Sequence, residues 1–197
     1  MATYKNDRAF TDFMHNRIAL NQIYSKLGWQ QLSIDAAVHL NLDMNLGIDY
    51  VFSSAEGQKY TVQERFRDNK YLHYTDFTLR YKREHNPDKS RMLSEFFKIN
   101  ASHFLYGISN GRKELLESNT HFAKFALVDM KIVENLLQSG TIEISHTLRG
   151  TCKWVDGKMI CPVNQNTDFS SSFVPIDIVI LLKIAPQAVL LQQGYHV

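Results

Sequence analysis

Apolar residues near the start of the chain recur every three or four positions, which is the spacing of one face of an α-helix. The series runs from Phe10 to Leu27, and Gly28 follows it directly. Because a glycine often stands just beyond the last turn of a helix, the spacing predicts an amphipathic helix over residues 8–27. Its opposite face is polar and is expected to face solvent, with Asp12, His15, Asn16 and Arg17 on it.

Shorter apolar stretches after this helix predict β-strands. Residues 48–52 and 60–66 are expected to form two strands joined by a glycine-containing turn, whereas residues 29–45 before them are polar and irregular. A second helix is expected at 130–138, with Asp129 as its N-cap and Gly140 beyond its end. Further strands are expected at 76–82, 95–99, 102–107, 122–128 and 141–148, with a loop at 85–90.

The order of these elements is helix, strands, helix, strands. Such an order is typical of an α/β or α+β fold in which a central mixed β-sheet is flanked by helices. A chain of 197 residues is long enough for one domain with a substantial core. We expect a single domain over residues 1–197, with its core at about 8–138 and the strands and hairpin of 139–197 appended to that core.

The dipeptide Asp156-Gly157 predicts a two-residue β-hairpin. Pairing outward from this turn places Cys152 opposite Cys161. The chain has 2 cysteines, and the neighbouring histidines do not fall at the spacing of zinc ligands. We therefore expect two reduced thiols that face each other, rather than a redox pair or part of a zinc site.

Composition narrows the class of protein only slightly. Hydrophobic residues make up 44% of the chain and charged residues 21%, which is a globular composition. A formal net charge of +2 is too small to indicate nucleic-acid binding by itself. The longest apolar run, residues 176–185, contains charged residues and is shorter than the roughly 20 residues of a membrane span. Because no apolar signal segment stands at the N-terminus either, a cytoplasmic location without membrane contact is expected.

Candidate chemistry is concentrated in the strand pair at 48–52 and 60–66. Asp49 stands at the start of the first strand, and the second strand carries the triplet Gln63-Glu64-Arg65. Carboxylate and amide oxygens bind hard divalent cations, and a neighbouring positive charge stabilises the charge that develops on phosphorus. The pair therefore indicates metal-dependent phosphodiester cleavage, for which an ordinary hairpin with a solvated outer face is the alternative.

Four stretches of the chain resemble the PD-(D/E)XK nuclease superfamily. They are Gly47-Ile48-Asp49-Tyr50-Val51, Thr61-Val62-Gln63-Glu64-Arg65, Asp76-Phe77-Thr78, and residues 98–106 with Ala101 and Tyr106. In that superfamily an aspartate opens the second core strand, and the third strand carries an acid or glutamine, one intervening residue, and a lysine or arginine. The resemblance covers about residues 8–138 and implies a restriction-endonuclease-like sheet.

The resemblance implies that Asp49, Gln63, Glu64 and Arg65 are catalytic. Asp49 matches the first metal-binding carboxylate, and either Gln63 or, in another register, Glu64 matches the second metal ligand. Because side chains alternate along a strand, Gln63 and Arg65 are expected on one face and Glu64 on the other, where its carboxylate would need a partner. Arg65, or Lys98 if it reaches the site, would stabilise charge on phosphorus, but an arginine cannot act as a base.

By this resemblance the chain is expected to be an endonuclease of the restriction or phage type that cuts double-stranded DNA with Mg²⁺, for which Mn²⁺ would substitute. Cutting both strands implies a homodimer or a partner subunit. Since Gln63 replaces the usual acid and Arg65 the usual lysine, the alternative is a nuclease-like module without a metal site that binds DNA or a protein. An unrelated small interaction or regulatory protein is the third hypothesis. Candidate DNA contacts are Arg67, Lys70, Arg80 and Lys82.

Overall fold

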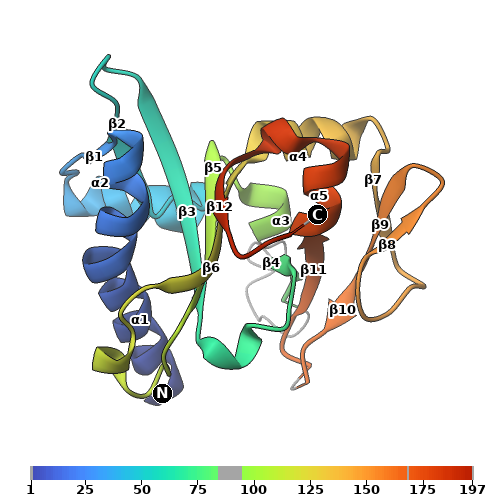
Figure 1. Ribbon diagram of the computed structural model, residues 1–197, viewed down its shortest axis with the longest axis horizontal. Coiled ribbons are helices and arrows are strands. Elements are labelled where there is room, and N and C mark those ends of the chain that lie inside the picture. The colour runs from blue at the N-terminus through green and yellow to red at the C-terminus, as the bar shows by residue number, and fades with distance from the viewer. Residues whose placement is uncertain (1, 84–94, 168, 197) are drawn as a thin grey trace.

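A mixed sheet of 6 strands in the order β1-β2-β3-β5-β6-β12 forms the centre of the computed structural model, which describes residues 2–83, 95–167 and 169–196 (Figure 1). Strands β3 and β5 are parallel, and the other neighbours are antiparallel. The expected α/β architecture is confirmed, whereas the loop expected at 85–90 lies outside the described residues. The strands are β1 Gln30–Gln31, β2 Tyr50–Ser53, β3 Lys59–Arg67, β5 His103–Ser109, β6 Phe122–Asp129 and β12 Val189–Gln193.

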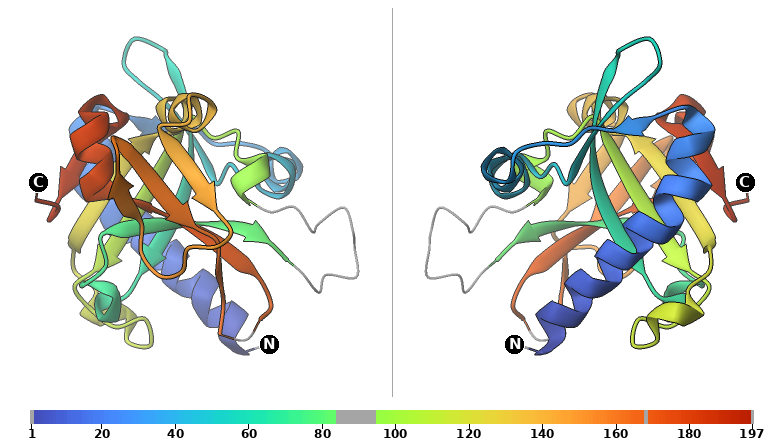
Figure 2. Two further views of the ribbon diagram at one scale, coloured as in Figure 1. Left: turned by 90° about the vertical axis from the view of Figure 1, so that its right-hand side faces the viewer. Right: turned by 90° about the vertical axis from the view of Figure 1, so that its left-hand side faces the viewer.

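Helices cover both faces of this sheet (Figure 2). On one face, α1 Ala2–Met14 continues without a break through η1 His15–Tyr24 and η2 Ser25–Leu27. The helix predicted at 8–27 is therefore present, begins earlier, and ends at Gly28, whose φ is 67°. Its apolar residues pack with those of the strands beneath it, among them Phe10, Met14, Ile23, Phe52, Val62, Leu105 and Leu127.

The second face packs against α4 Met130–Gln138 and α5 Ile178–Ile184. Asp129 caps α4 as predicted, because its Oδ1 accepts hydrogen bonds from the N–H groups of Lys131 and Ile132 at 2.9 and 3.2 Å. This core joins Val133, Ile178 and Leu181 of the two helices to strand residues on the second face of the sheet, Phe104, Ile108 and Val128.

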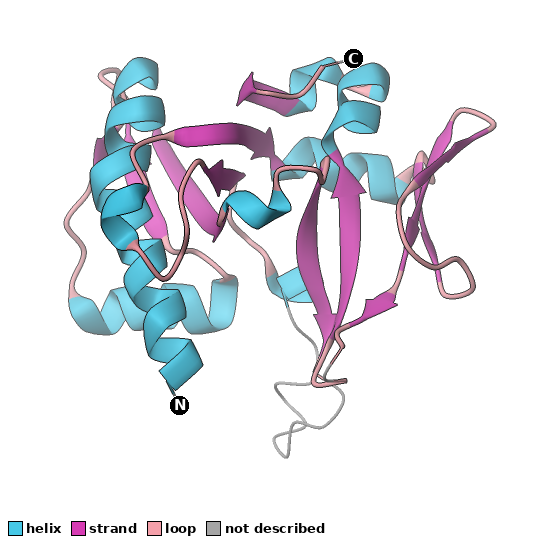
Figure 3. Ribbon diagram, turned by 60° about the horizontal axis from the view of Figure 1, so that its bottom comes forward, coloured by secondary structure: helices cyan, strands magenta, loops and turns pink. Residues whose placement is uncertain are grey.

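Two smaller sheets extend the second side of the molecule (Figure 3). Strand β4 Asp76–Lys82 pairs with β11 Ser172–Asp177, which also pairs with β10 Asn164–Gln165. The other small sheet has the order β7-β9-β8 and consists of β7 Ile142–Ser145, β8 Lys153–Val155 and β9 Lys158–Pro162.

The hairpin of β8 and β9 has the predicted register. Val155 lies opposite Lys158 and Trp154 opposite Met159. Cys152 and Cys161 are free thiols, and their Sγ atoms lie 3.7 Å apart. The predicted facing pair of thiols is therefore confirmed.

Three predictions about local structure are wrong. Residues 29–45 contain α2 Ala36–Asn41 and η3 Leu42–Leu46, since Asp35 caps α2 by accepting the N–H of Ala37 at 2.8 Å. Residues 95–98 form helix α3 (Glu95–Lys98) instead of a strand. The rings of Phe96 and Phe97 both contact Tyr81, with centroids at 5.3 and 4.9 Å, whereas a strand would point neighbouring residues to opposite faces.

The third error concerns residues 139–197, which are not appended to a finished core. Strand β12 pairs with β6 at the edge of the main sheet, and β11 pairs with β4. Helix α5 supplies Ile178 and Leu181 to the core. Among the described residues, no helix is long and apolar enough to cross a membrane.

Close packing between β5 and β6 predicts a severe effect of Gly107→Ala. A β-carbon at this position would overlap the ring of Phe122, which is fully buried. We expect urea denaturation to show a loss of about 1–3 kcal/mol in the free energy of unfolding. Phe122→Leu should lower the free energy of unfolding by less in the Gly107→Ala background than in the wild type. Equal losses in the two backgrounds would show that the overlap is absent.

Candidate active site

Asp49 lies immediately before β2, where Gly47, with a φ of 60°, turns the chain out of η3. The N–H of Asp49 donates to the carbonyl of Val62 at 2.9 Å. Its carboxylate Oδ2 accepts the backbone N–H of Glu64 at 2.7 Å. Because that N–H belongs to the peptide between Gln63 and Glu64, the carboxylate is held against β3 beside Gln63.

Gln63 carries a buried acceptor. The residue is 8% exposed, and no hydrogen-bond donor reaches its amide Oε1 within the part of the chain that the structure describes. A β-carbon on Gly47 would lie 3.5 Å from this Oε1, so the oxygen faces the segment that leads into Asp49. A buried oxygen without a donor is costly, and a bound cation would satisfy it.

Asp49 and Gln63 together fit a hard divalent cation. They offer a carboxylate and an unsatisfied amide oxygen from two adjacent strands, which are the ligand types that Mg²⁺ accepts in proteins. The described residues contain no group of three or more His, Cys, Asp or Glu side chains that could hold a metal. Any cation here would therefore keep several water ligands, as Mg²⁺ commonly does.

Arg65 lies two residues beyond Gln63, about 7 Å along β3 and on the same face. Its Nη1 donates to the carbonyl and to the hydroxyl Oγ1 of Thr78, at 2.8 and 3.2 Å. These bonds connect β3 to β4, which are not paired as strands. They also hold the guanidinium on the side of the sheet to which Gln63 belongs.

Lys98 stands at the end of α3, in a segment that runs beside the same turn. The N–H of Asn100 donates to the carbonyl of Leu46 at 2.9 Å. A β-carbon on Gly47 would also lie 3.4 Å from the side chain of Ile99. The segment that carries Lys98 is therefore adjacent to the segment that carries Asp49.

Glu64 points to the face of β3 opposite Gln63. Its side chain is 0% exposed, both carboxylate oxygens accept the Nδ1–H of His15 at 3.0 Å, and Oε1 accepts the hydroxyl of Tyr24 at 2.6 Å. Val62 and Phe66 lie on this face too, and they pack under the N-terminal helix. Glu64 is thus paired with the N-terminal helix, whereas the amide oxygen of Gln63 has no donor among the described residues.

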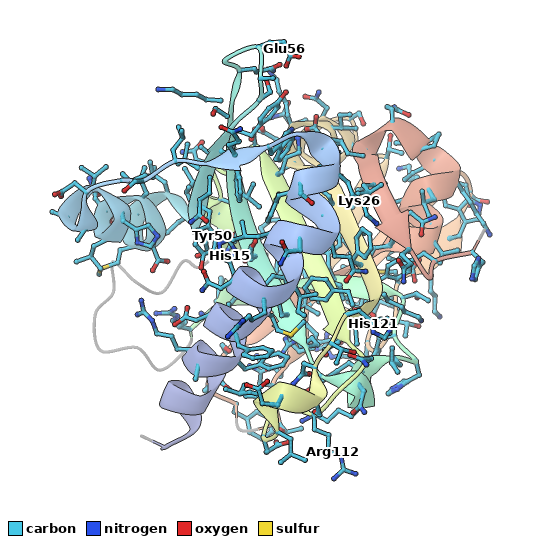
Figure 4. All side chains as sticks on the ribbon, turned by 60° about the vertical axis from the view of Figure 1, so that its left-hand side comes forward. His15, Lys26, Tyr50, Glu56, Arg112 and His121 are labelled. Carbon is cyan, nitrogen blue, oxygen red and sulfur yellow. The ribbon has the colours of Figure 1, made fainter. Side chains whose placement is uncertain are left out.

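His15 was expected on a solvated face and is instead 1% exposed, whereas Asp12, Asn16 and Arg17 are exposed as predicted. Its ring stacks on Tyr50 with a centroid separation of 3.5 Å (Figure 4), and its Nε2 lies 3.1 Å from Oε1 of Gln31. Burial alone lowers the pKa of His15, but the hydrogen bond and the charge of Glu64 outweigh burial and raise the pKa above its usual value.

Three of the four predicted DNA contacts lie together. Arg67, Lys70 and Arg80 line one hollow with Arg65, and Arg67 lies over the ring of Tyr71 at 5.2 Å. Lys70 is 3.4 Å from the carboxylate of Asp68. Lys82 lies apart from them, in a neighbouring hollow with Arg149.

Some residues of the site carried no usable signal in the sequence. His15 and Tyr24 are distant in the chain from Glu64, and a histidine on a helix is exposed more often than it is paired with a buried acid. Thr78 and Tyr106, which fall in two of the stretches that resemble the superfamily, line a cavity with Arg65 from β4 and β5. Alternation along β3 was the one signal that separated Glu64 from its neighbours.

Comparison with known proteins adds no relative. No family model matches the chain, and neither curated proteins nor solved structures give a match.

The two faces of β3 predict opposite effects on stability. Glu64→Ala should lower the free energy of unfolding by about 3–5 kcal/mol, because it leaves the buried His15 without its counter-charge. Gln63→Leu keeps the volume and removes an unsatisfied buried oxygen, so its effect should lie within about 1 kcal/mol of zero or be stabilising. Urea denaturation of the two variants tests this, and similar losses in both would contradict the assignment of faces.

Asp76 predicts a pH dependence of stability. Burial, assisted by the charge of Asp177, raises the pKa of Asp76 from 3.8 to about 6. Between these values the folded protein binds more protons than the unfolded chain, so this group lowers stability as pH rises from about 4 to 6. The Tm of Asp76→Asn relative to that of the wild type should therefore rise by on the order of 5 °C between pH 4 and pH 7. The exposed Glu117→Gln should show no such gain, and a constant difference for Asp76→Asn would refute the assignment.

Proposed function

We propose that this chain is a Mg²⁺-dependent DNA endonuclease, for which Mn²⁺ would substitute. The observation that carries the proposal is the Asp49 carboxylate held against β3 beside Gln63, whose buried amide oxygen has no donor among the described residues. The strand order supports the resemblance to the PD-(D/E)XK superfamily. Asp49 precedes the second strand, Gln63 and Arg65 lie on the third, and the stretch of Ala101 and Tyr106 leads into the parallel neighbour β5.

Each residue of the site has a distinct part in the proposed hydrolysis. Asp49 and Gln63 would hold Mg²⁺, which supplies polarisation of the phosphate and a water of lowered pKa. Arg65 would stabilise the charge that develops on the phosphoryl oxygens, and it stays protonated throughout. Lys98 is the second candidate for that stabilising role, since its segment runs beside Asp49.

The remaining cations would hold the DNA backbone. Arg67, Lys70 and Arg80 continue from Arg65 along one hollow, so successive phosphates of a strand would meet successive positive charges. Lys82 would contact a phosphate further along, in the neighbouring hollow. Such contacts position the duplex but carry no sequence information.

Double-stranded DNA requires two cuts, so we propose a homodimer or a partner subunit that brings a second site to the other strand. We also propose a cytoplasmic location.

A DNA-binding module without cleavage is the second candidate function. It is favoured by the pairing of Glu64 with His15 and Tyr24, which leaves Asp49 as the one carboxylate in the proposed pair of metal ligands. The hollow with Arg65, Arg67 and Arg80 would serve this function equally well.

Cleavage of plasmid DNA with Mg²⁺ separates the two candidates. Asp49→Ala should abolish cleavage, and Gln63→Ala should slow it at least ~100-fold, which is about 2.7 kcal/mol in the barrier. Gln63→Glu should retain cleavage because a carboxylate replaces the amide oxygen at the metal. A folded Asp49→Ala protein that cuts at the wild-type rate would refute the endonuclease, and a wild type that binds DNA without cutting it would favour the second candidate.

A further inference from the structure

A cavity of about 350 Å³ lies beside the candidate active site, and Asn166, Ser171 and Phe173 line it together with residues of β3 and β4. Arg65 and Arg67 enter it from β3, and Arg80 enters it from β4. Three guanidinium groups from two strands outnumber the one carboxylate in the lining, that of Asp76, so the cavity is net positive. Its volume is in the range of small-ligand sites. The cavity therefore suits an anion of the size of a nucleotide.

The other walls are aromatic and polar. Tyr71, Tyr106 and Phe173 present rings, and Asn166 and Ser171 present an amide and a hydroxyl. A phosphate ion alone would use only the arginines. A nucleobase has flat apolar faces that stack on rings and edges that accept and donate hydrogen bonds, so a complete nucleotide uses every wall.

An exposed ring belongs to the turn whose ends, Asn166 and Ser171, line this cavity. Phe169 is 66% exposed and has a φ of 55°, a conformation that few residues other than glycine adopt. Two backbone hydrogen bonds close its turn. The N–H of Phe169 donates to the carbonyl of Asn166, and the N–H of Asn166 donates to the carbonyl of Ser171, both at 2.9 Å. The turn thus exposes an apolar ring to solvent. Phe169 is three residues from Asn166 and two from Ser171 in the chain, and both of these residues line the cavity.

We propose that the cavity holds one unpaired nucleotide of the DNA, with its phosphate on Arg65, Arg67 and Arg80 and its base on the aromatic wall. Phe169 enters the base stack at the place that this nucleotide leaves. The inference rests on the proposed function for the identity of the ligand as DNA. It adds a preference for DNA in which a nucleotide next to the cleaved bond is unpaired or is extruded from the duplex.

Proteins that take a nucleotide out of a duplex share this combination of parts. Extrusion costs stacking and pairing energy, and the cost is smallest for a nucleotide that is already unpaired. An apolar side chain that enters the gap partly replaces the lost stacking. Because Gln63 precedes Arg65 by two residues on the same face of β3, a nucleotide in the cavity would lie next to the phosphate at Asp49 and Gln63.

The test is DNA binding measured by fluorescence anisotropy without divalent metal, so that cleavage does not interfere. Three labelled duplexes of one sequence are compared: fully paired, with one unpaired nucleotide, and with an abasic residue at that unpaired position. We expect the wild type to bind the duplex with the unpaired nucleotide at least about tenfold more tightly than the other two. Phe169→Ala and Arg80→Gln should lose this preference, whereas Trp154→Ala, which removes an exposed ring on β8 outside the cavity, should keep it.

Each outcome decides one proposal. Equal affinity for the paired duplex and the duplex with the unpaired nucleotide, no binding to any of the three, or an equal preference for the abasic duplex would overturn the nucleotide cavity. The last of these results would mean that bending at the unpaired site accounts for the preference. If the wild type cuts paired plasmid DNA but shows no preference, only the cavity is refuted. If it shows the preference but never cuts, the cavity stands and the endonuclease is refuted.

Discussion

A carboxylate removed from water has to be paired, and the pairing of Glu64 with His15 and Tyr24 determines how β3 is presented to the rest of the molecule. The carboxylate accepts the Nδ1–H of His15 at 3.0 Å and the hydroxyl of Tyr24 at 2.6 Å. It therefore faces the N-terminal helix, and the neighbours of Glu64 on β3 face the other way. The backbone N–H of the same residue holds the carboxylate of Asp49 at 2.7 Å, so one residue fixes the face of the strand and the position of the candidate metal ligand.

The face of β3 opposite Glu64 has a different character. Gln63, Arg65 and Arg67 follow one another along it, from a buried amide oxygen to the positive wall of the cavity. The hydrogen bonds of Arg65 to Thr78 bring β4 close without strand pairing, and the space between the two strands is lined by polar and aromatic side chains. Candidate chemistry and candidate DNA contacts thus share one surface because strand alternation places them there.

Local patterns were sufficient where neighbours in the chain decide the structure. The helical spacing up to Gly28, the Asp129 cap and the Asp156-Gly157 turn each depend on residues a few positions apart, and these predictions are confirmed. The short helix α3 could not be separated from a strand, because aromatic residues favour strands and the deciding contact is with Tyr81. The places of β11 and β12 depend on pairing with β4 and β6, which lie far away in the chain.

The candidate site was likewise predictable only where residues close together in the chain decide the structure. Alternation along β3 was enough to place Gln63 with Arg65 and to set Glu64 apart. The partner of Glu64 could not be predicted from the sequence, because His15 is 49 positions away and the neighbours of His15 on the helix are exposed. The cavity could not be predicted either, since Asn166, Ser171 and Phe173 line it with residues of β3 and β4. Contacts between distant segments are fixed by packing of the whole domain, and no local pattern encodes them.

The central claim is that Asp49 and Gln63 hold a divalent cation. Anomalous diffraction from crystals soaked in Mn²⁺ tests it most directly, because Mn²⁺ takes the same oxygen ligands as Mg²⁺ and its position is measured without any assay of activity. The account predicts an anomalous peak within roughly 2–2.5 Å of the Asp49 carboxylate and of Gln63 Oε1, and its loss in Asp49→Ala crystals. A peak at Glu64 instead, or none beside Asp49 at saturating Mn²⁺, would contradict it.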